Sequence, residues 1–527
     1  MKKSLLFAGL CAAMSLTAVA QNPYAYGLKA VGLNEGKVSA TATELKVNYT
    51  LNAAATTVSV DVYDGENLVK SFPIEAGATI GDHEASIPLA DLPKGKALTW
   101  KVKVTNPVPE SPVNTGKEFK FWSPYGIAVD NNTESDNFGR ILVTETQPNV
   151  PADNYWTAAE GVKNGIFAFT PQMERIKNAD GKYGFNAGLK FDNFMYASNQ
   201  TAFGPKKIRI AKDGRIFLGV QDCLHMPIYE VSQDLATATP LFAGNLAADT
   251  TGVVTDADGK FIAGASVAFD ITGTGDNLKL VNLSCKGGQV FSYGAFQCYQ
   301  YNLGSAKTID KAVTDDQEVL DYSMQYTISG QSVSLAYDDR GGIWYCQYRG
   351  APTEQQPAVK HINAQGEEDY SDTKTVCRGG GIAYNNDFSM LAFPIASKKI
   401  GVYQVDYDSD GKPTLTEIYT IDGITNGCND IAFDYADNLY TCCNSHEKFT
   451  QYQIPRLDDF IETPAAAKYA FTIDTNTGVA DNVAAKTVAS VKYYNMAGVE
   501  ASEPFAGVNV VVTTFTDGSK TVAKAVK

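Results

Sequence analysis

Histidine is scarce in this sequence, with four residues among 527. The sequence contains no G-x-S-x-G elbow, no H-E-x-x-H pair and no Gly-Lys pair followed by Ser or Thr. Serine-hydrolase, zinc-protease and P-loop chemistry therefore lack their usual motifs. No C-x-x-C pair occurs either, which leaves thioredoxin-type and zinc-ribbon chemistry without support. These absences favour a protein without catalysis and leave enzyme activity an open question.

Positively charged residues are fewer than negatively charged ones. Lys and Arg number 44 against 59 Asp and Glu, and the formal net charge is −15. An acidic chain without a basic cluster argues against nucleic acid and anionic membrane surfaces as partners. After the first twenty residues no stretch is long and apolar enough to cross a membrane, so we expect no transmembrane segment.

The first twenty residues have the pattern of a secretory signal peptide. Lys2 and Lys3 precede an apolar stretch from Leu5 to Leu16, and Ala18-Val19-Ala20 forms an A-x-A cleavage site before Gln21. We therefore expect an exported protein, either secreted or held at the outer-membrane surface, with the periplasm as the alternative location.

The middle of the chain repeats one pattern six times. Each repeat has an alternating apolar run, a turn containing Asp, Asn or Gly, and a second apolar run, as expected for a β-hairpin. The first runs are centred on Ile127, Ile208, Val267, Val333, Ile382 and Ile431. Recurring hairpins at loose spacing are typical of propeller blades. We predict an all-β protein with a β-propeller of roughly six blades over residues 119–475, closed by a strand near 118–122.

Residues 21–118 are predicted to form a separate β-sandwich. Alternating runs at 45–51, 58–63 and 99–104 are joined by turns such as Asp64-Gly65. The runs Val60-Asp61-Val62-Tyr63-Asp64 and Gly81-Asp82-His83 resemble the immunoglobulin-like domain of the flagellar hook-capping family, although the usual Trp-Asp-Gly is replaced by Ile87-Pro88-Leu89. This resemblance implies a structural module. A proline-rich segment at 106–112 reads as a semi-rigid spacer.

Residues 476–527 are predicted to form a third, small β-module. Tyr494-Asn495-Met496-Ala497-Gly498 precedes Gly507-Val508-Asn509-Val510-Val511, and the chain has a basic end. This order resembles the C-terminal sorting domain of the Por (type IX) secretion family, with Asn509 where that family usually has Tyr. The resemblance implies export or retention at the cell surface.

Candidate binding residues follow from propeller geometry. The start of each first strand and the end of each second strand meet at one rim, near the axis. The polar residues that we expect there, as a ligand-binding rim, are Tyr125, Glu145, Asp222, His225, Arg349, Arg378, Asn429, Asp430 and Asn444. The predicted function is binding of a glycan, a peptide or a surface protein.

The last repeat suggests an enzymatic alternative. The run 427–434 followed by 437–440 resembles a repeat of the gluconolactonase-like six-bladed family. That resemblance implies a divalent-metal-dependent lactonase, with Glu145, Asp222, Asp430 and Asn444 around an axial ion. The competing interpretation is that Asn429 and Asp430 bond the turn before a strand.

A second candidate metal site lies at 406–417. Asp406, Asp408, Asp410 and Glu417 fit the D-x-D-x-D-G-x5-E calcium-loop pattern. However, two evident strands flank this segment where helices are usual, so a plain hairpin turn is the favoured interpretation. Calcium is the cofactor that this pattern would hold.

The cysteines are expected to be reduced and mostly buried. Cys223, Cys346, Cys442 and Cys443 lie in or just after the second strand of a predicted hairpin, where cysteine acts as a small hydrophobic residue. Adjacent Cys442 and Cys443 point to opposite faces of one strand, so we expect at most one to face the core.

Overall fold

The structure is a computed structural model of the chain. It describes residues 21–147, 155–191, 195–196, 201–202, 204–220, 228–241, 254–255, 261–263, 266–285, 295–304, 317–318, 323–325, 334–346, 359–372, 380–385, 388–395, 398–424, 427–443, 447–475, 487–516 and 518–527. The prediction of an all-β protein is confirmed, because this part of the chain is built almost wholly from small sheets. Its α-helical structure is limited to α1 (Trp156–Glu160), beside short 3-10 turns such as η4 (Gly275–Asn277) and η5 (Ala467–Tyr469).

Two sheets form the N-terminal unit. One sheet has the order β1-β3-β6, with strands Ala25–Val31, Glu44–Leu51 and Gly81–Pro88. The other has the order β2-β38-β7-β4-β5, with β37 also paired to β7; its strands are Lys37–Val38, Phe471–Ile473, Ala97–Thr105, Thr57–Asp64, Asn67–Pro73 and Phe460–Pro464. Alternating buried side chains from both sheets, including Val47, Val60 and Trp100, form one core.

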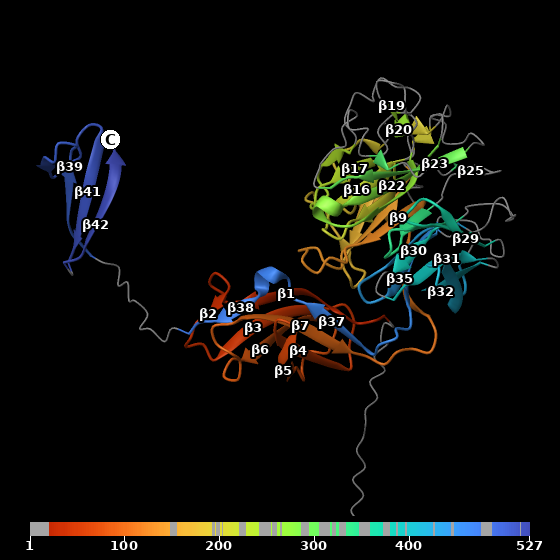
Figure 1. Ribbon diagram of the computed structural model, residues 1–527, viewed down its shortest axis with the longest axis horizontal. Coiled ribbons are helices and arrows are strands. Elements are labelled where there is room, and N and C mark those ends of the chain that lie inside the picture. Colours follow the sequence, from red (N-terminus) through yellow and green to blue (C-terminus); the bar gives the residue numbers. More distant parts are fainter. Residues whose placement is uncertain are drawn as a thin grey trace, which may run out of the picture.

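Two strands of the second sheet come from a distant part of the sequence. Strands β37 and β38 pair with β7, although about 350 residues that include strands β9–β36 separate them from it in the chain. Figure 1 shows these blue strands among the red and orange strands of the N-terminal unit. Phe471 and Ile473 are buried in the shared core, and the indole of Trp100 donates to the carbonyl of Tyr469 at 3.0 Å. Residues 460–473 thus belong structurally to the N-terminal unit.

Six further sheets follow one another along the chain, and we number them 1 to 6. Sheet 1 holds β9 (Pro124–Val129), β10 (Ile141–Glu145), β11 (Gly165–Phe169) and β12 (Arg175–Ile176). Sheet 2 holds β15 (Pro205–Ile210), β16 (Ile216–Val220), β17 (Ile228–Val231) and β18 (Ala238–Pro240). Sheet 3 holds β21 (Ser266–Thr272), β22 (Lys279–Cys285), β23 (Ala295–Asn302), β24 (Gln317–Glu318) and β25 (Ser323–Gln325).

Sheets 4 to 6 repeat the same antiparallel order. Sheet 4 holds β26 (Ser334–Tyr337), β27 (Ile343–Cys346), β28 (Val359–Ile362) and β29 (Glu368–Asp372). Sheet 5 holds β30 (Ala383–Asn385), β31 (Met390–Ile395), β32 (Lys399–Tyr407) and β33 (Pro413–Ile421). Sheet 6 holds β34 (Cys428–Phe433), β35 (Asn438–Cys443), β36 (Lys448–Gln453) and β8 (Val113–Lys120). Two small hairpins, β13 (Met195–Tyr196) with β14 (Thr201–Ala202) and β19 (Val254–Thr255) with β20 (Phe261–Ala263), lie outside these sheets.

The first strands of the six sheets contact one another in a closed cycle. The order is β9, β15, β21, β26, β30 and β34, and β34 returns to β9. We call this assembly the sheet ring. The outer strand of sheet 6 is β8, which precedes sheet 1 in the sequence. The prediction that a strand near 118–122 pairs with the last repeat is therefore confirmed, with the strand spanning Val113–Lys120.

The inner strands of the ring, such as β10, β16, β31 and β35, are buried on both faces. Cys442 packs with Phe121 and Ile127, whereas Cys443 packs with Ile400 and Ile431. The expectation that at most one of these two cysteines faces the core was therefore wrong, because strand β35 is buried on both faces, between two core clusters. Cys346, Cys428, Cys442 and Cys443 are buried, as expected for Cys346, Cys442 and Cys443, and no disulfide joins them in this structure, whereas Cys223 lies outside the described residues.

The C-terminal residues form a separate sheet. Its order is β40-β39-β41-β42, with strands Glu500–Ala501, Val488–Tyr494, Val508–Phe515 and Lys520–Val526. Asn509 is its buried polar residue and bonds the backbone of Phe505 and Gly507. Among the described residues, no helix is long and apolar enough to cross a membrane.

Candidate functional site

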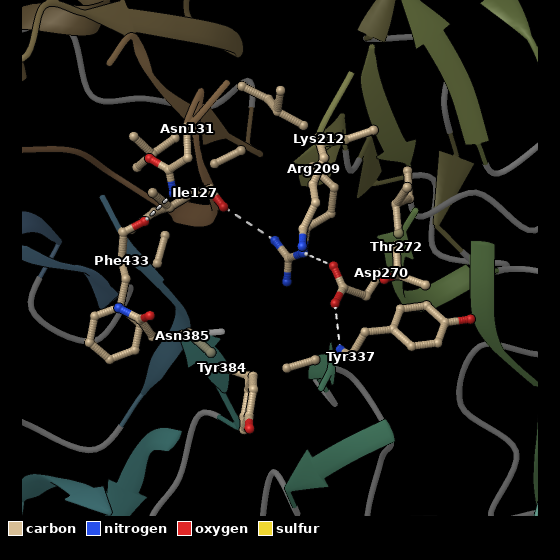
Figure 2. A pocket seen from close by; sticks show the side chains of 18 of the residues that line it. Ile127, Asn131, Arg209, Lys212, Asp270, Thr272, Tyr337, Tyr384, Asn385 and Phe433 are labelled. Carbon is tan, nitrogen blue, oxygen red and sulfur yellow. Dashed lines mark hydrogen bonds and ion pairs between the residues drawn. The ribbon is translucent and has the colours of Figure 1, made fainter. Parts of the chain in front are cut away.

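A cavity of about 490 Å³ lies where all six first strands of the sheet ring end. Every sheet contributes to its wall, and Figure 2 shows this cavity from close by. Its polar and aromatic lining residues include Asn131, Arg209, Lys212, Asp270, Thr272, Tyr337, Tyr384, Asn385, Phe433 and Tyr435. The described residues of the candidate rim lie elsewhere: Tyr125, Asn429 and Asp430 near the starts of β9 and β34, and Glu145 at the end of β10.

Arg209 forms the floor of this cavity. Its Nε lies 3.2 Å from Asp270 Oδ1, and its two terminal nitrogens donate to the two carboxylate oxygens of Asp430 at 2.7 and 3.0 Å. The guanidinium also donates to the carbonyl of Ile127 at 3.2 Å. Figure 2 shows the guanidinium between Ile127 and Asp270, whose second oxygen accepts from the Tyr337 backbone at 2.7 Å. Besides its own sheet 2, the floor is thus tied to sheets 1, 3, 4 and 6.

Lys207 extends this network below the floor. Its Nζ lies 3.2 Å from Asp430 Oδ1 and donates to the carbonyl of Asn429 at 2.5 Å. The Ser334 hydroxyl also donates to Asp430, at 3.1 Å. Lys207 and Asp430 are fully buried, so this network occupies the centre of the sheet ring.

Two positive and two negative groups balance one another in this network. Burial opposes ionisation of Asp430, but Arg209 and Lys207 outweigh it and hold its pKa below the usual value. For Asp270 burial prevails over Arg209 and raises the pKa. Burial also lowers the pKa of Lys207, against the attraction of Asp430. Buried charges are tolerated only when paired in this way.

The axial metal of the lactonase alternative does not fit this arrangement. A divalent ion at Asp430 would have to displace two cationic side chains that already contact both carboxylate oxygens. Glu145 does not face Asp430's network either. Its oxygens accept from the backbone N–H groups of Trp122 and Ser123 at 2.8 and 2.7 Å. Burial raises the pKa of Glu145 to about 8, against the lowering effect of backbone N–H groups.

Glu145 thus holds the backbone just before β9, and the other described residues of the candidate rim support the same segment. The Asn429 amide donates to the carbonyl of Pro124 at 3.3 Å, and the Tyr125 ring lies 4.8 Å from the Nζ of Lys206. Tyr125, Glu145 and Asn429 are all buried. These residues therefore hold the segment 122–125 at the start of β9. Asp222, His225, Arg349, Arg378 and Asn444 lie outside the described residues.

The candidate calcium loop is the turn of a hairpin. Asp408 Oδ1 accepts from the backbone of Asp410 and Lys412, both at 2.9 Å. Glu417 lies on β33 and accepts from Tyr403 at 3.2 Å and Thr420 at 2.6 Å. Asp406 lies opposite Thr414 within the strand pair. Across the described ranges, no cluster of three or more His, Cys, Asp or Glu residues could hold a metal ion.

One wall of the cavity is supported by the N-terminal unit. Tyr435 lines the cavity, and its hydroxyl donates to the carbonyl of Glu462 in β37 at 2.8 Å. Its ring also packs near Tyr24, with centroids 6.2 Å apart. Asp434, whose pKa burial raises to about 6, accepts from Asn438, which in turn contacts Asn22. The position of this wall therefore depends on the N-terminal unit.

The described lining of the cavity combines hydrogen-bonding side chains with apolar ones. Among the described lining residues no Ser, Cys or His is present to act as nucleophile or base. Amide and hydroxyl groups of Asn131, Thr272 and Tyr384 alternate with apolar residues of the strands. A signal for this site was present in the sequence, because Lys207 and Arg209 are two residues apart on one strand and so share a face.

No protein-family model matches the sequence, and no curated protein matches it either. Two solved structures are similar at 11% identity and a TM-score of 0.33. One is a structural genomics protein of unknown function from Bacteroides thetaiotaomicron VPI-5482, covering 82% of this chain and 98% of its own. The other belongs to a mitotic checkpoint complex, covering 67% of this chain and 93% of its own. At these TM-scores neither carries an argument about function.

Proposed function

We propose that this protein is an exported, six-bladed β-propeller that binds a peptide segment of a partner protein in the axial cavity, without catalysis. The observation that carries this proposal is the blind cavity formed by the ends of six first strands. Its volume, about 490 Å³, is within the range of small-ligand sites. The Arg209–Asp430 network lies across the centre of the ring below it, so we expect a ligand to enter from the side where the strands end.

The lining favours a peptide over a glycan. Sugar rings are usually held against exposed aromatic faces, yet none of the four aromatic lining residues is fully exposed: Tyr337 and Phe433 are buried, and Tyr384 and Tyr435 are half-buried. Amide and hydroxyl groups such as those of Asn131 and Thr272 match the hydrogen-bonding groups of a peptide backbone. The exposed Lys212 at the edge adds a cation that can pair with an acidic group on the partner.

The roles of the domains and the export of the protein are part of the proposal. The N-terminal unit serves as an immunoglobulin-like structural module, and the last sheet serves as a type IX sorting-like module. Residues 1–20 act as a signal peptide, which places the mature protein outside the inner membrane. N-terminal sequencing of the exported protein tests this part, with Gln21 expected as the first residue.

The binding role is tested with a cavity-filling variant. Peptides selected from a random displayed library on the wild-type protein are measured against Asn131→Trp, which fills the cavity edge. Lys182→Trp, an exposed residue of the same region outside the cavity, is the matched control. We expect a loss of affinity of about tenfold or more in Asn131→Trp, equivalent to about 1.4 kcal/mol, and none in Lys182→Trp. Equal binding to all three proteins, or no selectable peptide, would count against the proposal.

A further inference from the structure

Cys428 and Cys443 lie directly opposite each other in sheet 6. They are register partners in the antiparallel pair β34–β35, and both are buried, at 0% and 4% exposure. Partners in an antiparallel pair have Cα atoms about 4.5 to 5.5 Å apart. A disulfide needs a Cα separation of about 4.4 to 6.8 Å. The backbone of this sheet therefore already has the spacing that a cross-strand disulfide requires.

Both side chains also lie on the same face of the sheet. Cys428 and Cys443 belong to one core cluster, which includes Ile424 and Tyr452. Cys442, the next residue, lies opposite Asp430 and packs into a different core with Phe121. The strand alternation therefore directs Cys443 toward Cys428 and Cys442 away from it.

We propose that Cys428 and Cys443 are a modification site, which a disulfide-bearing oxidant such as glutathione disulfide converts into a cross-strand disulfide. The thiolate of one cysteine attacks the oxidant and releases one reduced glutathione. The thiolate of the other then displaces the second glutathione, and the two leaving glutathione thiolates take up the two protons that the cysteines lose. Two thiols are oxidised and one glutathione disulfide is reduced to two thiols, so electrons and atoms balance.

The burial of both sulfurs determines when this reaction takes place. Exchange with a soluble oxidant requires access, so the bond forms during folding or in transient openings of the sheet rather than in the closed ring. The product links the two strands on either side of the turn 434–437, which carries Tyr435 of the cavity wall. A bond across this loop restricts the unfolded chain and stabilises the native sheet.

The test is refolding of the full chain from the reduced, denatured state in a glutathione redox buffer. Remaining thiols are then alkylated and the protein is digested with chymotrypsin, which cuts after residues such as Phe433 and Tyr440. Residues 428 and 443 then fall in separate peptides, and Cys442→Ser removes ambiguity from the neighbouring thiol. We expect non-reducing mass spectra to show these two peptides joined, in the wild type and in Cys442→Ser.

Two results would overturn the proposal. One is recovery of Cys428 and Cys443 as alkylated thiols from refolded protein, and the other is either residue joined to a different cysteine. A second measurement follows stability: oxidation should raise the midpoint of thermal unfolding of the wild type and Cys442→Ser, but not of Cys443→Ala. An equal rise in Cys443→Ala would place the oxidation elsewhere and likewise reject this pair.

Discussion

Arg209 and Asp430 form a two-point ion pair across the centre of the sheet ring. The two guanidinium nitrogens lie 2.7 and 3.0 Å from the two carboxylate oxygens, and the residues belong to sheets 2 and 6. Such paired, parallel hydrogen bonds fix geometry as well as charge. Together with Asp270 and Lys207, this pair turns the centre of the ring into a closed floor rather than an open channel.

Removing Asp430 should destabilise the ring strongly. Asp430→Ala leaves Lys207 and Arg209 as buried cations with one remaining carboxylate, and loss of one partner of a buried ion pair costs about 3–5 kcal/mol. The measurement is urea-induced unfolding followed by tryptophan fluorescence. The exposed pair Lys46–Glu84 supplies the control, because Glu84→Ala should leave the midpoint unchanged. An Asp430→Ala midpoint equal to that of Glu84→Ala would show that the network does not hold the ring.

Glu145 should make the stability of the protein decrease with rising pH. Its pKa in the fold is about 8 against a reference of 4.5, so the folded state binds the proton more tightly. This contribution is fully present below the reference pKa and is lost as the pH rises through the pKa of the folded state. The shift corresponds to at most ~5 kcal/mol, because one pKa unit is about 1.4 kcal/mol.

Thermal unfolding of the wild type and Glu145→Gln across the range between these two pKa values checks this prediction. The glutamine side chain cannot titrate, so the variant should show a flatter dependence on pH even if it is less stable overall. Parallel curves for the two proteins would assign the pH dependence to other groups, such as Asp434, whose pKa burial also raises.

The local parts of this fold are predictable from the sequence, and the long-range parts are not. Alternation and Gly or Asp turns indicate hairpins such as β15–β16, because side-chain direction has a period of two. The pairing of Phe471 with Leu98 cannot be predicted from the residues around either one, because the two strands are far apart in the sequence. The spacing of Lys207 and Arg209 is a signal for the cavity's end of the ring, but polar residues such as Glu145 and Asn429, which bond backbone groups, favour the other end from sequence alone.

The N-terminal unit should not fold from its N-terminal residues alone. A fragment of residues 21–118 lacks β37 and β38, so the buried faces of Leu98 and Trp100 lose Phe471, Ile473 and the Tyr469 carbonyl. Exposing this much apolar surface in a small domain removes much of its stability. Fusing residues 456–475 to the fragment through a flexible Gly/Ser linker should restore it.

Amide hydrogen exchange and circular dichroism of both fragments give the readout. The expected outcome is a cooperative thermal transition only when residues 456–475 are present. A fragment of 21–118 with the same midpoint and protection as the fused protein would mean that the returning strands are accessory.

Asn22 should control how firmly the N-terminal unit holds the cavity wall. Its backbone N–H donates to the side-chain oxygen of Asn438 in sheet 6 at 2.7 Å, and its side-chain amide donates to the carbonyls of Ala436 and Ile454 at 2.8 and 2.9 Å. Asn22→Ala leaves those buried carbonyls and the Gln453 amide without this partner, which costs about 3 kcal/mol.

The effect of Asn22→Ala should be visible at the turn 434–438 itself. We expect faster amide hydrogen exchange there and a lower thermal midpoint, because the turn loses its anchor on the N-terminal unit. Asn67→Ala, on the exposed end of strand β5, should change neither quantity. If Asn22→Ala exchanges like Asn67→Ala, the wall is rigid without the N-terminal unit, and Tyr435 keeps its position through its own sheet.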